Sequence, residues 1–119
     1  MATPKDHPLL IDGERVETGE WTDVRSPFSG ELVGRVARGG AAEARRALDA
    51  AARVLNEPLP AHERARILDE VARLLTERHD EAARLISAEA GKPMKAARVE
   101  AQRAVSTFTF AAVEARRLS

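Results

Sequence analysis

The spacing of apolar residues changes once along the chain, at about residue 39. Before that point, short apolar runs are separated by glycine and proline, which is typical of short strands joined by turns. After it, apolar residues recur every three or four positions, which is the period of an α-helix. The pattern therefore predicts an α+β chain in which a β-hairpin and short strands precede about four helices.

The strongest local signal in the first part is a hairpin. Residues 9–11 and 15–17 flank Asp12-Gly13, a dipeptide favoured in the type I′ turn because both of its residues tolerate a positive φ angle. Residues 1–8 are mostly polar, and we expect this N-terminal stretch to be disordered.

Two further strands are predicted before residue 39. Residues 21–25 form a possible strand that stops at Ser26-Pro27. A turn over residues 27–30 then leads into residues 31–37, where apolar and polar residues alternate well enough for a half-buried strand.

The first two helices are separated by a proline-containing segment, residues 56–60. On the first helix, the residues that share an apolar face are Ala44, Ala47, Leu48, Ala51 and Leu55. Pro60 is suited to the first turn of the second helix, because the backbone N–H that proline lacks would have no hydrogen-bond partner at that position. The second helix has the clearest apolar stripe, formed by Ile67, Leu68, Val71, Leu74 and Leu75.

The last two helices meet at Gly91-Lys92-Pro93, where a left-handed glycine ends one helix and a proline begins the next. The third helix opens near Asp80, a good N-cap residue, and carries Leu85 and Ile86 inward. The stripe of the fourth helix comprises Ala97, Ala101, Ala104, Val105, Phe108, Ala112 and Ala115. This pattern continues to Ser119 without a stop signal, so we expect the chain to be cut from a longer protein.

The charged residues are balanced, with 19 Lys and Arg against 19 Asp and Glu, and the two signs are interspersed. This distribution argues against a basic nucleic-acid surface and against an acidic tail. No segment has the apolar length of a membrane span, and the first residues lack a signal-peptide pattern. We therefore expect a cytoplasmic protein that binds neither nucleic acid nor membrane.

The sequence offers few groups for catalysis or metal binding. It contains no cysteine, which excludes a thiol nucleophile and a thiolate metal site within these residues. His7, His62 and His79 lack the spacing of a metal-binding motif, so exposed positions are the expected interpretation and no metal site is predicted.

Carboxylates are frequent in the helical part, but each lies close in sequence to an arginine. Glu63 with Arg66 and Asp69 with Arg73 have the spacing of neighbours on one helix face. We interpret them as solvated ion pairs, which stabilise a helix only slightly. No pair of carboxylates is therefore predicted to act as an acid and base in catalysis.

The glycine residues do not form a dinucleotide-binding fingerprint. Residues 30–34 lead into a strand, whereas a phosphate-binding loop leads out of a strand into a helix. Gly39-Gly40 precedes a helix, so its N–H groups either bind an anion or simply begin that helix. The residues themselves therefore predict no catalytic and no cofactor-binding group in this chain.

Taken in order, six segments resemble the NAD(P)-dependent aldehyde dehydrogenase family. Two of them lie in the strand region: Ile11-Asp12-Gly13-Glu14 followed by Trp21, and residues 26–34, which are similar to the pattern NP-x-TGE-x-x-G. Four lie in the helical region, at residues 47–51, 63–68, 89–93 and 110–115. Each segment is a weak signal alone, but the ordered set is specific and covers about residues 9–119.

The resemblance implies that residues 9–119 are the N-terminal segment of an α/β aldehyde dehydrogenase subunit, before its Rossmann core and catalytic domain. Members of the family oxidise aldehydes to acids with NAD or NADP, using a cysteine and a glutamate that lie beyond this segment. The implied partners are the remainder of the subunit, a small aldehyde and further copies in a homodimer or homotetramer. The segment alone is expected to be inactive.

The resemblance also assigns a possible substrate contact to Arg103. In branches that act on anionic aldehydes, such as glyceraldehyde-3-phosphate, lactaldehyde and phosphonoacetaldehyde dehydrogenases, an arginine at the matching place faces the substrate entrance. A guanidinium suits this role because it binds carboxylate or phosphate with paired hydrogen bonds. Arg103 borders the apolar stripe, between Ala101 and Ala104. The alternative is an ordinary surface arginine.

A second position that the resemblance singles out is Glu89, which matches a residue that some relatives use near a structural monovalent cation. The alternative is a carboxylate that merely stands at the end of a helix.

At the level of the whole chain, the alternative to an enzyme fragment is a free-standing helical module. Such a module would bind a protein partner through the apolar stripes of the second and fourth helices. A fragment of a larger core is expected to expose apolar surface and self-associate, whereas an evolved module is expected to be monodisperse and to fold cooperatively.

Overall fold

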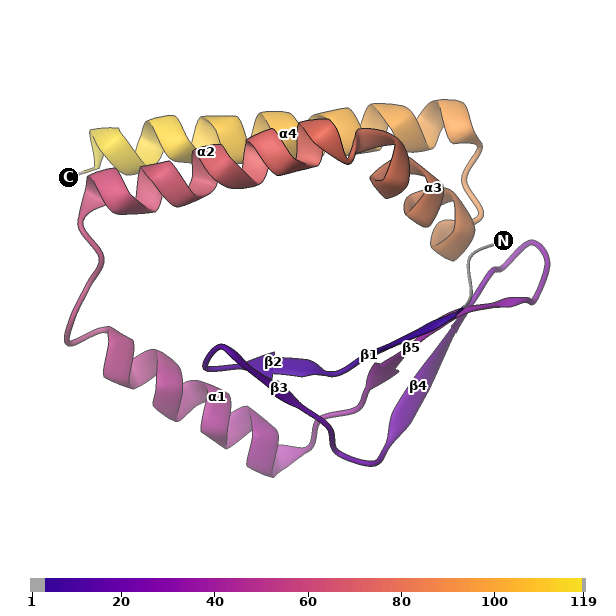
Figure 1. Ribbon diagram of the computed structural model, residues 1–119, viewed down its shortest axis with the longest axis horizontal. Coiled ribbons are helices and arrows are strands. Elements are labelled where there is room, and N and C mark those ends of the chain that lie inside the picture. Colours follow the sequence, from indigo (N-terminus) through magenta and orange to yellow (C-terminus); the bar gives the residue numbers. More distant parts are fainter. Residues whose placement is uncertain (1–3, 119) are drawn as a thin grey trace. The chain divides into compact units, whose positions relative to one another are not determined.

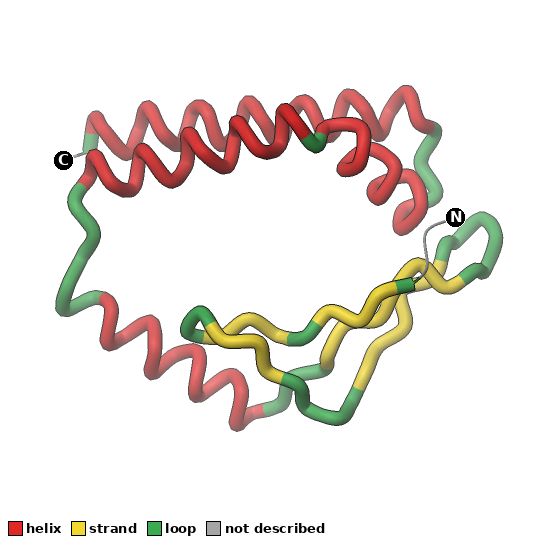
Figure 2. Tube along the Cα trace, viewed as in Figure 1, coloured by secondary structure: helices red, strands yellow, loops and turns green. Residues whose placement is uncertain are grey.

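The computed structural model describes residues 4–118, and the chain divides into two compact units, residues 1–58 and residues 59–119. Within the described residues, the first unit contains short strands and one helix, and the second is entirely helical (Figures 1 and 2). The expected α+β class is therefore confirmed, with strands first and four helices after them.

The first unit holds six elements. They are β1 (Lys5–His7), β2 (Leu9–Ile11), β3 (Glu14–Val16), β4 (Trp21–Arg25), β5 (Leu32–Ala37) and α1 (Ala41–Val54). The strands form two sheets: a three-stranded sheet in the order β1-β5-β4, and a two-stranded hairpin of β2 and β3.

The hairpin has the turn that its sequence predicts. Leu9 pairs with Val16 and Ile11 with Glu14, so two residues connect the strands. Those residues, Asp12 and Gly13, have φ angles of 55° and 75°, as a type I′ turn requires.

The three-stranded sheet has β5 at its centre. β4 runs antiparallel to β5, with Trp21 opposite Ala37, whereas β1 runs parallel to it, with Asp6 opposite Arg35. Gly34 permits the approach of β1, because a Cβ atom at this position would lie 3.0 Å from the carbonyl oxygen of Lys5.

The N-terminal stretch differs from the disorder expected for residues 1–8. Lys5–His7 form strand β1, and the Arg35 guanidinium donates two hydrogen bonds, of 2.8 and 2.6 Å, to the carboxylate of Asp6. The expectation of disorder is therefore wrong for this strand, whose pairing compensates for its lack of apolar residues. Residues 1–3 lie outside the described residues.

Helix α1 forms where the period changes, but its predicted apolar face is not the buried one. Ala50 is its buried residue, whereas the Leu48 side chain is 70% exposed and Leu55, just after the helix, is 79% exposed. The helix is tied to the hairpin by ion pairs from Arg53 to Asp12 and from Arg46 to Glu14.

The second unit consists of α2 (Ala61–Glu77), α3 (His79–Ala90) and α4 (Met94–Arg117). Both α2 and α3 pack against α4 (Figure 1). The fully or nearly fully buried residues are all alanines: Ala65, Ala72, Ala83, Ala97, Ala101 and Ala112. Larger apolar side chains, such as Leu68 and Phe108, are half-buried around them. The predicted stripe of α4 is thus confirmed as its packing face.

The ends of these helices follow their glycine and prolines. Gly91 ends α3 with a φ angle of 66°, the left-handed conformation expected there, and Pro60 and Pro93 immediately precede α2 and α4. The prediction of Asp80 as the N-cap of α3 is wrong. Asp80 lies inside the first turn, and its carboxylate accepts hydrogen bonds from Arg84.

Candidate functional site

Arg103 lies near the middle of α4 and is exposed. Among residues 4–118, no carboxylate or carbonyl oxygen accepts a hydrogen bond from its guanidinium. Its backbone carbonyl has the usual role in the helix and also accepts a hydrogen bond of 3.0 Å from the Thr107 hydroxyl. The cationic group of Arg103 is therefore available to an external anion.

This availability distinguishes Arg103 from the other arginines of the second unit. In the described part of this unit, every other arginine donates a hydrogen bond to a carboxylate or carbonyl oxygen, or forms an ion pair with a carboxylate. They are Arg64, Arg66, Arg73, Arg78, Arg84, Arg98, Arg116 and Arg117. Glu100, one turn before Arg103, pairs instead with Lys92. Arg103 thus lacks the helix-surface partner that an ordinary surface arginine finds here.

The side chains around Arg103 form an exposed stripe opposite the packing face of α4, which we call the outer face. It consists of Val99, Arg103, Ser106, Phe110 and Val113, which lie within an arc of about 80° at 100° per residue. Val99 is 58% exposed, Phe110 70% and Val113 54%. The guanidinium of Arg103, which has no partner among the described residues, is therefore flanked on this face by three exposed apolar side chains.

The hydroxyl groups near Arg103 are directed to the helix backbone. Ser106 donates to the carbonyl oxygen of Gln102 at 3.3 Å, and Thr107 and Thr109 likewise donate to carbonyl oxygens four residues earlier. Their protons are therefore already used, which leaves the guanidinium as the strong donor of this face.

The three histidines and the helix carboxylates do not form a metal site. His62 is exposed, whereas half-buried His79 lies with Nε2 3.0 Å from the backbone oxygen of Arg98, so its interpretation as a purely exposed residue is wrong. His7 lies on β1. Within residues 4–118, no three His, Asp or Glu side chains are close enough together to hold one metal ion.

The expected ion pairs are only partly correct. Glu63 bonds to Arg66 at 3.0 Å, as its spacing predicts. Asp69, by contrast, pairs with Arg116 of α4 at 2.5 Å, because Arg73 is already held by Glu70 and Glu77 on its own helix. The sequence therefore predicts a local ion pair for Asp69, whereas the structure pairs it with Arg116, so that the bond joins α2 to α4.

Glu89 stands in the last turn of α3 and is exposed. The structure places it at a helix end, where the backbone dipole disfavours a negative charge. Within the described chain, Glu89 does not belong to any group of three or more His, Asp or Glu side chains that could hold a metal ion.

The glycine segments are accounted for without a bound nucleotide. Gly30 has a φ angle of 73° and closes a turn by donating to the Ser26 carbonyl at 2.8 Å. At the start of α1, the Gly40 N–H donates to the Glu43 carboxylate at 2.8 Å, and this bond lowers the pKa of Glu43. The chain's own carboxylate thus occupies the place of an anion, and these residues do not fit a nicotinamide dinucleotide.

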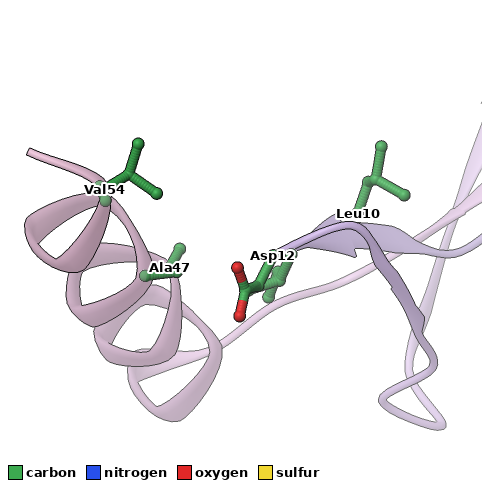
Figure 3. Close-up of a pocket in the computed structure, with 7 residues that line it drawn as sticks. Leu10, Asp12, Ala47 and Val54 are labelled. Atoms are coloured by element: carbon green, nitrogen blue, oxygen red, sulfur yellow. The ribbon is translucent and has the colours of Figure 1, made fainter. Parts of the chain in front are cut away.

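The first unit contains a pocket of about 440 Å³ between β2 and α1 (Figure 3). Its lining is mostly apolar and comprises Leu10, Ile11, Asp12, Ala47, Ala50, Ala51 and Val54. The carboxylate of Asp12, its one charged group, bonds to Arg53 at 2.6 Å. The pocket therefore offers no uncommitted polar group to a ligand, and Arg103 stays the better candidate.

Sequence reasoning identified Arg103 but did not identify the rest of the outer face. The signal was present: Val99, Arg103, Ser106, Phe110 and Val113 follow one another at spacings of four, three, four and three residues. The wider alanine-rich stripe on the opposite side of the same helix obscured it.

The comparison with protein families gives a match over most of the chain. The family described as "Aldehyde dehydrogenase family" matches residues 15–119. This range includes β4 and β5 of the first unit and all four helices.

Individual relatives support the same family. Succinate-semialdehyde dehydrogenase [NADP(+)] GabD of Escherichia coli (strain K12) is 41% identical over 92% of this chain and 23% of its own length. Lactaldehyde dehydrogenase of the same strain is 37% identical over 98% of this chain and 25% of its own length. The chain therefore spans about a quarter of the length of these curated relatives.

Solved structures have the same fold over this region. The crystal structure of aldehyde dehydrogenase 21 from Physcomitrella patens, in complex with the reaction product succinate, matches with a TM-score of 0.92 and 30% identity. The match covers 99% of this chain and 25% of that one.

Proposed function

Because the chain belongs to the aldehyde dehydrogenase family, we propose that it forms the N-terminal part of a subunit that oxidises an aldehyde to a carboxylic acid with NAD or NADP. The observation that carries this proposal is the family match over residues 15–119, together with relatives about four times as long. On this proposal the cysteine, the glutamate and the cofactor site belong to the remainder of the subunit, and the 119 residues alone are inactive.

The reading frame that encodes the chain tests its place in a longer enzyme. We expect the frame to continue after the codon for Ser119 and to encode a glycine-rich cofactor turn, then a glutamate and then a cysteine. A stop codon directly after Ser119 would contradict the proposal and would favour a separate protein.

The role proposed for this chain's own residues is recognition of an anionic group on the aldehyde by Arg103. It is supported by the guanidinium that is unpaired among the described residues, and by GabD, named for succinate semialdehyde, an aldehyde with a carboxylate. Lactaldehyde, for which the other relative is named, is uncharged. Both kinds of aldehyde therefore belong in the test.

Arg103→Leu in the full-length enzyme tests this role. We expect the KM for an anionic aldehyde to rise about tenfold or more, because a charge-assisted, paired hydrogen bond is worth roughly 1.5–3 kcal/mol. The KM for an uncharged aldehyde should change much less. Equal changes for both aldehydes would show that Arg103 supports the fold and does not bind the substrate.

The proposed partners are the remainder of the subunit and further copies in a homo-oligomer, in the cytoplasm. The exposed apolar side chains of Leu48, Leu55 and Phe110 support a larger assembly, because they are surfaces that additional protein would cover. Light scattering of the full-length enzyme measures its oligomeric state. No helix among the described residues has the length and apolar content needed to cross a membrane.

The structure gives less support to a free-standing interaction module. That alternative requires the apolar stripes of the second and fourth helices to be available to a partner. In the described chain, α4 packs against α2 and α3 through its predicted stripe, in which Ala97 and Ala112 are buried. On α2, Leu68, Val71 and Leu75 of the predicted stripe are half-buried, whereas Ile67 and Leu74 are exposed.

A further inference from the structure

The turn of the β2–β3 hairpin contains an aspartate that is followed by glycine, Asp12-Gly13. The sequence has six aspartates, and each of the other five is followed by a residue with a side chain: His7, Val24, Ala50, Glu70 and Glu81. A side chain hinders the approach of another group to the backbone nitrogen of its own residue, whereas glycine has no Cβ atom. Asp12 is therefore the aspartate whose carboxyl group the following nitrogen reaches with the least hindrance.

This arrangement permits a reaction within the chain. The backbone nitrogen of Gly13 bonds to Cγ of Asp12, and the hydroxyl group of the carboxylic acid leaves with the amide proton as water. The product is a five-membered succinimide ring, which water then opens at one of its two carbonyl carbons. Opening at Cγ restores aspartate, whereas opening at the main-chain carbonyl carbon gives isoaspartate, in which the chain continues through Cγ. One water molecule leaves and one enters, so the reaction needs no oxidant, reductant or cofactor.

Both residues of the turn are open to solvent. The side chain of Asp12 is 44% exposed, and a Cβ atom placed on Gly13 would meet no atom within 4 Å. The turn therefore leaves room both for the ring and for the water molecule that opens it.

One contact of Asp12 opposes the reaction. Its Oδ2 atom accepts a hydrogen bond of 2.6 Å from Nη2 of Arg53, on the side of the hairpin that faces α1 (Figure 3). Ring closure requires the carboxyl group to lose an oxygen, and this charge-assisted bond stabilises the intact carboxylate. Because the Arg53 side chain is 64% exposed, its hold on Asp12 is weak, and it should slow the reaction without preventing it.

We propose that Asp12-Gly13 is a site of spontaneous isomerisation to isoaspartate, and that Arg53 slows this reaction while α1 packs on the hairpin. The product has one additional methylene group in its backbone, so the two-residue connection that pairs Ile11 with Glu14 changes its length. The free carboxylate of the product also stands on a different carbon atom from the one that Arg53 binds. Isomerisation would therefore loosen α1 from the hairpin. This inference does not depend on the proposed function.

The test measures isomerisation in the full-length protein, which is incubated for several weeks in ¹⁸O-labelled water at mildly acidic pH. Each opening of a succinimide adds one ¹⁸O atom, and mass spectrometry of the tryptic peptides locates it. Electron-transfer fragmentation of the same peptides distinguishes isoaspartate from aspartate. We expect both the label and isoaspartate at Asp12, with severalfold less of each at the other five aspartates.

Arginine variants separate the contact with Asp12 from the general attachment of α1. Arg53→Ala should raise the rate of labelling at Asp12 about two- to fivefold, the range expected for loss of an exposed ion pair. Arg46→Ala is the matched control, because Arg46 joins the same helix to Glu14 of the same hairpin, and it should leave the rate close to that of the wild type. Arg53→Lys, which keeps the positive charge, should retain most of the protection.

Asp12→Asn shows whether the ring can form in this turn. Asparagine tolerates the positive φ angle of this position, and it forms the same succinimide with loss of ammonia in place of water. We expect the amide to be lost during the incubation, faster than Asp12 is labelled in the wild type, with aspartate and isoaspartate as the products.

Three results would overturn the inference. One is an amide that survives the incubation unchanged in Asp12→Asn. Another is labelling at Asp12 that does not exceed that of the other aspartates, in both the wild type and Arg53→Ala. The third is a rate in Arg53→Ala no higher than in Arg46→Ala. If thermal unfolding shows that either alanine variant has lost its fold, Arg53→Gln and Arg46→Gln provide the same comparison.

Discussion

Alanine side chains occupy the closest contacts among the helices of the second unit. Ala83 on α3 packs with Ala97 and Ala101 on α4, and none of the three is more than 3% exposed. Each alanine buries little apolar area. The two helices approach so closely at these positions, however, that a side chain larger than a methyl group would not fit. Size at these positions therefore matters more than hydrophobicity.

Ala97→Leu is expected to destabilise the protein although leucine is more hydrophobic. Overpacking a closely packed site typically costs about 1–3 kcal/mol. Ala96→Leu is the matched control, because Ala96 is the exposed neighbour of Ala97 on the same helix. This substitution should change the free energy of unfolding little. Urea denaturation of both variants provides the comparison. Equal stability of the two would show that the α3–α4 contact is looser than described.

Gly91 is the residue whose backbone conformation ends α3. Because its φ angle is 66°, Gly91→Ala should destabilise the protein by about 1–2 kcal/mol, the cost of the left-handed conformation for a residue with a Cβ atom. Gly91→Asn should be milder, since asparagine tolerates this conformation better. If thermal denaturation gives both variants the wild-type stability, the turn does not require a left-handed residue.

Ion pairs and hydrogen bonds connect α3 with α4 at the start of α3. The Asp80 carboxylate accepts from Arg84 on its own helix and lies 3.5 Å from Nε of Arg98 on α4. Beside it, His79 Nε2 is 3.0 Å from the Arg98 carbonyl oxygen, to which it donates. These contacts complement the alanine packing farther along the same pair of helices.

Asp80 makes the stability of this junction depend on pH. Hydrogen bonding to Arg84, and then the charges of Arg84 and Arg98, lower the pKa of Asp80 below its usual 3.8. A lowered folded-state pKa means that the carboxylate stabilises the fold above about pH 3.8 and that this contribution is lost as the pH falls through the folded-state value.

Asp80→Asn should therefore be less stable than the wild type at pH 7, and the difference should shrink as the pH falls below 3.8. Urea denaturation of both proteins across this pH range measures the effect. Glu57→Gln, which removes an exposed carboxylate in the connection before α2, is the control variant. If the difference in stability between Asp80→Asn and the wild type does not change with pH, Arg84 does not lower the pKa of Asp80 in the folded protein.

At the level of the whole molecule, features specified by neighbouring residues could be predicted from the sequence. Asp12-Gly13 predicts its turn because both residues tolerate positive φ, and Gly91-Lys92-Pro93 separates two helices for equally local reasons. The packing face of α4 was predictable because its apolar residues recur with the helical period from Ala97 to Ala115, about five turns.

Features that depend on distant residues could not be predicted. Strand β1 is three polar residues long and exists through pairing with β5, almost thirty residues later. Helix α1 itself was predictable, but its buried side was not, because the apolar residues on a short helix do not reveal which of them the rest of the protein covers. Asp69 pairs with Arg116, which lies 47 residues away, and no local spacing indicates that pair.

The candidate site likewise has one feature that could be predicted from the sequence and one that could not. The position of Arg103 followed from a resemblance and from helical spacing. Arg103 has no partner among the described residues, and Glu100, one turn before it, pairs instead with Lys92 of the connection that precedes α4. That competition is visible only in three dimensions.

Aldehyde-dependent reduction of NAD⁺ and NADP⁺, followed as absorbance of the reduced nicotinamide, shows whether these 119 residues are the inactive N-terminal part of an oxidising enzyme. It is measured on the full-length enzyme and on the purified 119-residue chain under the same conditions. We expect turnover by the full-length enzyme and none by the chain alone, which has no cysteine. Turnover by the 119 residues alone, or none by the full-length enzyme with any aldehyde, would contradict it.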